Sequence, residues 1–153
     1  MTSDVDRANL RNLVQETVSN MGLRFYDLEY NKVSRILRVY IDKEKGSVTI
    51  KDCQSTSNAL SRVLDDSEMI NFPYTLEVSS PGIERPLKRI EHYKWATGKV
   101  VEIDTGMERI KGFLRGAKKE GIVIASGSDE KIIPYGSIRK AKVIEETIHD
   151  KRN

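Results

Sequence analysis

The side chains of this sequence that could carry out catalysis are few and lie apart. Ser79 and Ser80 are possible nucleophiles, but the chain has no Gly-x-Ser-x-Gly motif, and the proline after Ser80 does not suit a strand-to-helix elbow. His92 is a possible general base, although an isolated histidine is more often a surface residue, and we expect it at the surface. The chain also has no Walker loop and no dinucleotide fingerprint. These observations favour a binding protein over an enzyme, without catalytic residues and without a cofactor.

Residues that bind metals are equally sparse. The single cysteine, Cys53, and the two histidines, His92 and His149, do not form a ligand set, and acidic pairs such as Asp65-Asp66 are typical of solvated faces. Cys53 has no partner for an internal disulfide, which fits a reducing compartment, and we expect its side chain in the core. No apolar run approaches the roughly 18 residues needed to cross a bilayer. We therefore expect no metal site, no membrane partner and a cytoplasmic protein.

Positive charge is the strongest chemical bias of the chain. Residues 1–90 contain 13 basic and 13 acidic residues, and residues 91–153 contain 13 and 10, so the net charge of +3 arises in the second part. Eleven consecutive positions without an acid hold five cations: Arg109, Lys111, Arg115, Lys118 and Lys119. Such a cluster favours an anionic partner through phosphate contacts and counterion release. The alternative is a lysine-rich strand edge that prevents aggregation.

A stiff segment precedes this basic region. Residues 78–89, Val-Ser-Ser-Pro-Gly-Ile-Glu-Arg-Pro-Leu-Lys-Arg, contain two of the four prolines, and we call them the proline segment. Each proline fixes its own φ and removes an amide donor, while Gly82 permits a backbone conformation that other residues resist. We expect a basic hinge over residues 83–96 between two domains. Three of its cations are candidate partner contacts beside the five above: Arg85, Lys88 and Arg89.

The chain before the hinge is predicted to form a two-layer α+β domain over residues 1–82. Apolar residues at helical spacing predict a helix over residues 4–20, with Ser3 or Asp4 as N-cap. Alternating runs at residues 23–32 and 36–41 are too close for a crossover and predict an antiparallel hairpin. A second helix capped by Thr49 and a third strand at residues 74–79 complete the order. Both helices should cover one face of the sheet; the other face would carry Phe25, Ile36 and Tyr40.

The chain after the hinge is predicted to form a small β-rich domain over residues 97–145. Five short alternating runs separated by turn residues predict five strands, at residues 100–103, 110–114, 122–124, 131–133 and 138–143. So many strands in so short a chain favour a closed barrel, because closure removes exposed edges. The short turn before the fifth strand fits an SH3-like (Sm-like) barrel better than an OB-fold. Residues 146–153 are expected to form a flexible tail.

The proline segment carries a family resemblance. Residues 76–87, Leu-Glu-Val-Ser-Ser-Pro-Gly-Ile-Glu-Arg-Pro-Leu, resemble the signature of the bacterial ribosome maturation factor RimP family, which usually has Leu and Asp where this chain has Ile83 and Glu84. Residues 37–42 and 48–65 are similar to the family's second strand and second helix, and residues 112–116 and 133–138 to parts of its barrel. The signature residues carried over are Ser79, Ser80, Pro81, Gly82, Arg85 and Pro86.

The resemblance implies a non-catalytic cytoplasmic factor for maturation of the small ribosomal subunit. Its implied partners are the immature subunit, that is rRNA and the ribosomal protein that lines the decoding centre, with no small-molecule substrate, and we expect a monomer. An alternative is a protein-only adaptor whose barrel binds a ribosomal protein without touching RNA. Arg85 also has two interpretations, because an arginine can bridge phosphate oxygens or pair internally and lock the domains together.

Overall fold

The computed structural model describes residues 7–70, 72–82 and 84–144 of the 153-residue chain. The expected N-cap at Ser3 or Asp4 and the expected tail at residues 146–153 lie outside these ranges. The chain divides into two compact units, Met1–Pro81 and Gly82–Asn153, which are described separately. Within the described ranges, no helix has the length and apolar character needed to span a bilayer.

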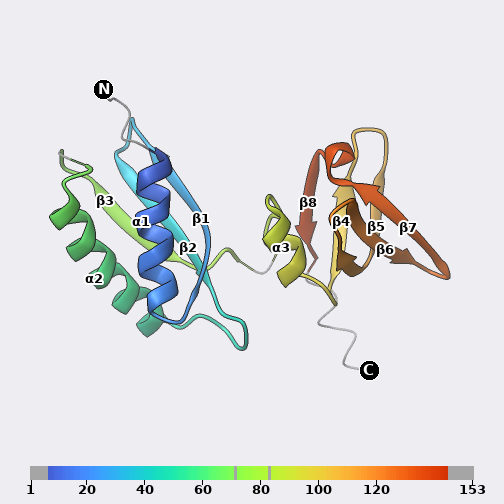
Figure 1. Ribbon diagram of the computed structural model, residues 1–153, viewed down its shortest axis with the longest axis horizontal. Coiled ribbons are helices and arrows are strands. Elements are labelled where there is room, and N and C mark those ends of the chain that lie inside the picture. Colours follow the sequence, from blue (N-terminus) through green and yellow to red (C-terminus); the bar gives the residue numbers. More distant parts are fainter. Residues whose placement is uncertain (1–6, 71, 83, 145–153) are drawn as a thin grey trace. The chain divides into compact units, whose positions relative to one another are not determined.

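The N-terminal unit is a mixed three-stranded sheet with two helices on one face (Figure 1). Its elements follow the order α1 (Arg7–Asn20), β1 (Arg24–Asn31), β2 (Ile36–Asp42), α2 (Ile50–Ser67) and β3 (Thr75–Ser79). β1 and β2 form the predicted antiparallel hairpin, and α2 is the crossover that brings β3 parallel to β2. The element order and the single helical layer predicted from the sequence are confirmed.

Local sequence explains where the helices of this unit begin and end. Thr49 caps α2 with a full capping box: the Asp52 amide donates to the Thr49 hydroxyl at 3.0 Å, and the Thr49 amide donates to the Asp52 carboxylate at 2.9 Å. α1 ends at Asn20, two residues before Gly22, whose φ of 81° suits a residue without a Cβ. Cys53 is half-buried against the core, and burial, followed by the charge of Asp52, raises the pKa of its thiol.

The core of the N-terminal unit lies between the helices and the inner face of the sheet. Its fully buried members come from α1, α2 and β2: Leu10, Val14, Val18, Leu37, Val39, Ile41, Leu60 and Leu64. The prediction that Phe25 lies on the other face was wrong. A register shift between Phe25 and Asp27 changes the alternation of β1, so Phe25 is only 8% exposed and belongs to this core.

The face that the two helices do not cover is polar rather than apolar. Arg38 pairs with Glu77 at 2.8 Å and with Glu29 at 3.8 Å, and the Tyr40 hydroxyl donates to Glu29 at 3.2 Å. Hydrogen bonding and charge from Glu77 raise the pKa of Arg38. Ile36 and Tyr40 lie on this face as predicted, each half-buried among these charged neighbours.

The C-terminal unit is a short helix followed by an antiparallel five-stranded sheet. The elements are α3 (Ile90–Trp95), β4 (Val100–Asp104), β5 (Arg109–Ala117), β6 (Gly121–Ser126), β7 (Asp129–Pro134), the 3-10 turn η1 (Tyr135–Ser137) and β8 (Lys140–Val143). All five predicted strands are present, and the sheet order is β7-β6-β5-β4-β8. The described strands do not form the predicted closed barrel, because β7 and β8 are the two ends of this order. The outer edge of β8 is instead occupied by the proline segment, through an isolated bridge between Pro86 and Lys142.

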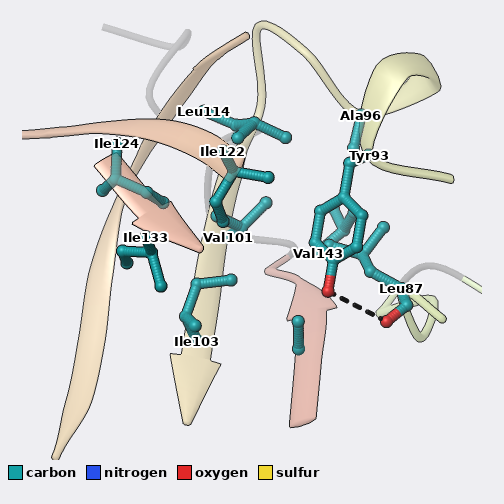
Figure 2. Packing of buried hydrophobic residues seen from close by; sticks show 11 residues of the cluster. Leu87, Tyr93, Ala96, Val101, Ile103, Leu114, Ile122, Ile124, Ile133 and Val143 are labelled. Carbon is teal, nitrogen blue, oxygen red and sulfur yellow. Dashed lines mark hydrogen bonds between the residues drawn. The ribbon is translucent and has the colours of Figure 1, made fainter. Parts of the chain in front are cut away.

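The core of the C-terminal unit lies on the inner face of its sheet and includes α3 (Figure 2). Its buried side chains are Leu87, Tyr93, Ala96, Val101, Ile103, Leu114, Ile122, Ile124, Ile133, Ala141 and Val143. Two strands approach each other closely at a glycine of β6. A Cβ on Gly121 would overlap the main-chain carbonyl of Ile133 on β7, so only glycine fits this position of β6.

Candidate functional site

The proline segment is bound to the edge of β8 by main-chain hydrogen bonds. The Leu87 amide donates to the Ala141 carbonyl at 2.9 Å, and the Val143 amide donates to the Arg85 carbonyl at 3.0 Å. Residues 85–87 therefore act as a short additional strand of the C-terminal sheet. Pro86 suits this place because its missing amide lies between the two bonds, where no donor is required.

His92 fixes the end of the proline segment from within the fold. Its Nδ1 accepts hydrogen bonds from the amides of Lys88 at 3.0 Å and Arg89 at 3.2 Å, and the residue is 1% exposed. The expectation that His92 lies at the surface was therefore wrong. The ring is buried because it satisfies two main-chain donors at the start of α3, a role that a sequence pattern does not show.

Tyr93 anchors the same segment from the core. Its hydroxyl donates to the Leu87 carbonyl at 3.3 Å, as Figure 2 shows, and its ring lies 5.7 Å from that of Tyr135. Burial, followed by the charge of Tyr135, raises the pKa of Tyr93 to about 12. Together, β8, His92 and Tyr93 hold residues 85–89 in one conformation.

Strand register arranges alternating charges on the outer face of this sheet, the face opposite the core. Lys142 on β8 lies opposite Glu102 on β4, which lies opposite Lys111 on β5. Two residues away, Lys140, Asp104 and Arg109 form a second row of the same kind. Directly opposite residues share a face, so each carboxylate of β4 lies between two cations.

Residues of both rows line a groove that runs along the proline segment. The groove has a volume of about 760 Å³. We call it the basic groove. Its cations are Lys88, Arg89, Arg109, Arg139, Lys140 and Lys142. Its carboxylates are Glu84, Glu102 and Asp104, and its apolar contacts include Pro86, Ile90, Tyr135 and Ile138. Six cations against three carboxylates favour an anionic ligand.

The cations predicted as contacts separate into groups. Lys88, Arg89 and Arg109 line the basic groove. Alternation places Arg85, which is half-buried, on the face of Leu87 rather than that of Pro86, and it does not line the groove. Lys111 is exposed on β5 beside the groove. Arg115 pairs with Glu130 at 3.1 Å, and Lys118 and Lys119 are exposed at the turn between β5 and β6, at the other end of β5 from Arg109.

Three groove cations were missed by sequence reasoning: Arg139, Lys140 and Lys142. The alternation of Lys140 and Lys142 with buried Ala141 and Val143 was the available signal, because it shows both lysines on the outer face. The position of Arg139 depends on the turn before β8, where its amide donates to the Asp104 carbonyl at 2.7 Å.

The remaining signature residues lie at the junction between the two units. Ser79 ends β3 and is half-buried, Ser80 is exposed, and Pro81 is half-buried. Gly82 has a φ of 92° and open space where a Cβ would lie, so glycine is needed there for backbone conformation and not to avoid a clash. Within the described chain, no group of three or more His, Cys, Asp and Glu side chains is arranged to hold a metal ion.

Comparison with known protein families identifies the class of the N-terminal unit. Residues 13–84 match the family model of the RimP N-terminal domain, a match that runs from α1 into the proline segment. Residues 13–84 therefore form a RimP N-terminal domain, which confirms the resemblance of residues 76–87 to the RimP family of ribosome maturation factors.

Proposed function

We propose that this protein is a non-catalytic assembly factor that binds the immature small ribosomal subunit and assists its maturation. The match to the RimP N-terminal domain supports a role in ribosome maturation, and the basic groove supports direct contact with rRNA. The protein acts in the cytoplasm as a monomer and uses no cofactor. Its partners are rRNA and the ribosomal protein that lines the decoding centre.

The observation that carries this proposal is the anchoring of the groove cations. The amides of Lys88 and Arg89 are fixed by His92, and Lys140 and Lys142 lie on a paired strand. Arg89, Arg109, Arg139 and Lys140 form no ion pair with any part of the chain that the structure describes. Because the main chain that carries these cations is fixed, less backbone entropy is lost when they bind phosphates, which favours binding of an RNA backbone.

We also propose that the C-terminal unit is an SH3-like domain in which the proline segment takes the place of barrel closure. Support comes from the five antiparallel strands around one core and from the 3-10 turn directly before β8. In this arrangement the segment protects the edge of β8, which would otherwise be open to pairing with another chain.

Co-migration with ribosomal particles tests the proposal. The protein should migrate with free small subunits in a sucrose gradient and not with intact ribosomes; migration with neither would disprove a ribosomal role.

A groove variant, Arg89→Gln with Arg139→Gln and Lys140→Gln, should weaken binding and reduce its salt dependence by about one unit of slope for each phosphate that is no longer bound. The matched control is Lys99→Gln with Lys118→Gln and Lys119→Gln, which removes the same charge from exposed positions outside the groove.

The same measurement separates RNA binding from a protein-only adaptor. If the groove touches rRNA, the groove variant changes the salt slope and the wild-type protein also binds protein-free rRNA of the small subunit. An adaptor would bind the subunit with the same salt slope in both variants and would not bind the bare rRNA. If the control variant alone changes the slope, the RNA contact includes Lys99, Lys118 or Lys119 and not the groove.

A further inference from the structure

We propose that the basic groove receives an unpaired stretch of RNA and that Glu102 recognises a guanine base in it. The inference rests on the proposed function, which it extends from RNA contact to the class of nucleotide. It starts from an inconsistency in the groove, namely a carboxylate without a partner among the described residues in a surface suited to an anionic ligand.

Two of the three groove carboxylates are already engaged by the protein. Glu84 pairs with Lys142 at 3.2 Å, and Asp104 accepts the Gly106 amide at 2.8 Å in the turn after β4. The Glu102 side chain is half-buried, and although Lys142 and Lys111 lie opposite it on the adjacent strands, its carboxylate has no hydrogen bond or ion pair with any described residue. A carboxylate in such a position repels phosphates, so it weakens RNA binding unless the bound RNA supplies hydrogen-bond donors.

The combination of charges selects the ligand. A basic peptide would satisfy Glu102 but would be repelled by the six groove cations. An acidic peptide would satisfy the cations but would place more carboxylates beside Glu102. An unpaired nucleotide satisfies both, because its phosphate is anionic while the edge of its base donates hydrogen bonds. The volume of about 760 Å³ lies in the range of small-molecule sites and can hold single nucleotides.

Pro86, Lys142 and Glu102 form a row across adjacent strands, and we place the base against this row. These residues are neighbours across adjacent strands and share the outer face, so Pro86 and Glu102 are about 10 Å apart at two strand spacings. A base between them would contact the proline ring and the aliphatic stem of Lys142, with its edge toward the carboxylate. Guanine fits best because its N1–H and N2–H donors are adjacent and parallel, so that they match both carboxylate oxygens. Uracil, cytosine and adenine do not offer two such donors on one edge.

Nine-residue oligouridines with one central substitution test the inference by fluorescence anisotropy at low salt. We expect the oligonucleotide with guanosine to bind on the order of 10-fold more tightly than those with adenosine, cytidine or uridine. Inosine keeps N1–H and lacks the N2 amine, so its oligonucleotide should fall in between. Glu102→Gln should abolish the preference for guanosine, whereas Asp129→Asn, which removes one negative charge outside the groove, should preserve it.

Each other outcome overturns the inference. Equal binding of all five oligonucleotides to the wild-type protein would exclude base recognition, whether or not the variant folds. A uniform increase in affinity for Glu102→Gln, with the guanosine preference retained, would show that this carboxylate only repels RNA. Absence of oligonucleotide binding would refute the groove as a site for unpaired RNA. Co-migration with free small subunits would still support the proposed function in any of these cases.

Discussion

Replacement of His92 by alanine should destabilise the C-terminal unit and release the groove cations at the end of the proline segment. The variant loses two hydrogen bonds to the amides of Lys88 and Arg89, each with a net contribution of about 1 kcal/mol. Removal of a ring that is 1% exposed adds about 1–2 kcal/mol for lost burial and a partly filled cavity. The free energy of unfolding of this unit should therefore fall by about 3–4 kcal/mol.

Urea unfolding followed by tryptophan fluorescence measures this effect selectively. Trp95 is the only tryptophan, lies at the end of α3 and has its ring centroid 6.0 Å from that of His92, so its signal reports on the C-terminal unit. Hydrogen exchange of the Lys88 and Arg89 amides should also accelerate more than that of core amides.

His92→Asn is the matched control for the role of the ring nitrogen. The Asn carbonyl oxygen can occupy nearly the position of Nδ1, so this variant should keep both hydrogen bonds and lose only about 1–2 kcal/mol. Equal destabilisation by the two substitutions would refute the reasoning, because the acceptor would then contribute nothing. A loss below about 1 kcal/mol for His92→Ala would refute it as well.

Two further predictions concern other parts of the fold. The salt bridge from Lys43 at 2.8 Å and the hydrogen bond from Thr49 lower the pKa of Asp52 to about 2, so its contribution to stability is present above the unfolded value near 3.8 and is lost as the pH falls toward 2. Asp52→Asn should thus be less stable than wild type at neutral pH and equally stable near pH 2 by circular dichroism in urea; a pH-independent difference would contradict this. Gly121→Ala should destabilise the C-terminal unit by about 1–3 kcal/mol through overlap with the next strand, whereas Gly116→Ala, with no atom near the added methyl, should have little effect on the fluorescence-detected midpoint. Equal effects of the two alanines would show that close strand approach does not require the glycine.

Local patterns were sufficient to predict most elements of the fold. The capping box at Thr49 and Asp52 depends on residues three apart, and strands such as β4 and β8 depend on the alternation of buried and more exposed residues within one short run. Such features are decided within one element, so they can be recognised without knowing the neighbours. The position of Phe25 was not predicted because a bulge in β1 depends on how that strand pairs with β2.

The candidate site could be predicted only in part, because proximity in sequence differs from proximity in space. Arg109 and Lys118 belong to one basic run of the sequence but lie at opposite ends of β5. Conversely, Glu84 and Lys142 are 58 positions apart and form an ion pair in the groove. The sequence therefore predicted the sign of the charge and the importance of the proline segment, while strand register determined which cations share a surface.

Arg85 shows most clearly how pairing determines the role of a signature residue. Its carbonyl is bonded to Val143, so alternation directs its side chain to the face of Leu87, while Pro86 on the opposite face borders the groove. The stiffness that Pro86 gives to the backbone therefore orients two different surfaces at once. Because Arg85 and the groove cations belong to different faces, a contact of Arg85 with the partner and a contact of the groove with RNA are independent hypotheses. A variant of one leaves the other testable, and loss of partner binding in Arg85→Ala at unchanged stability would identify a second contact surface.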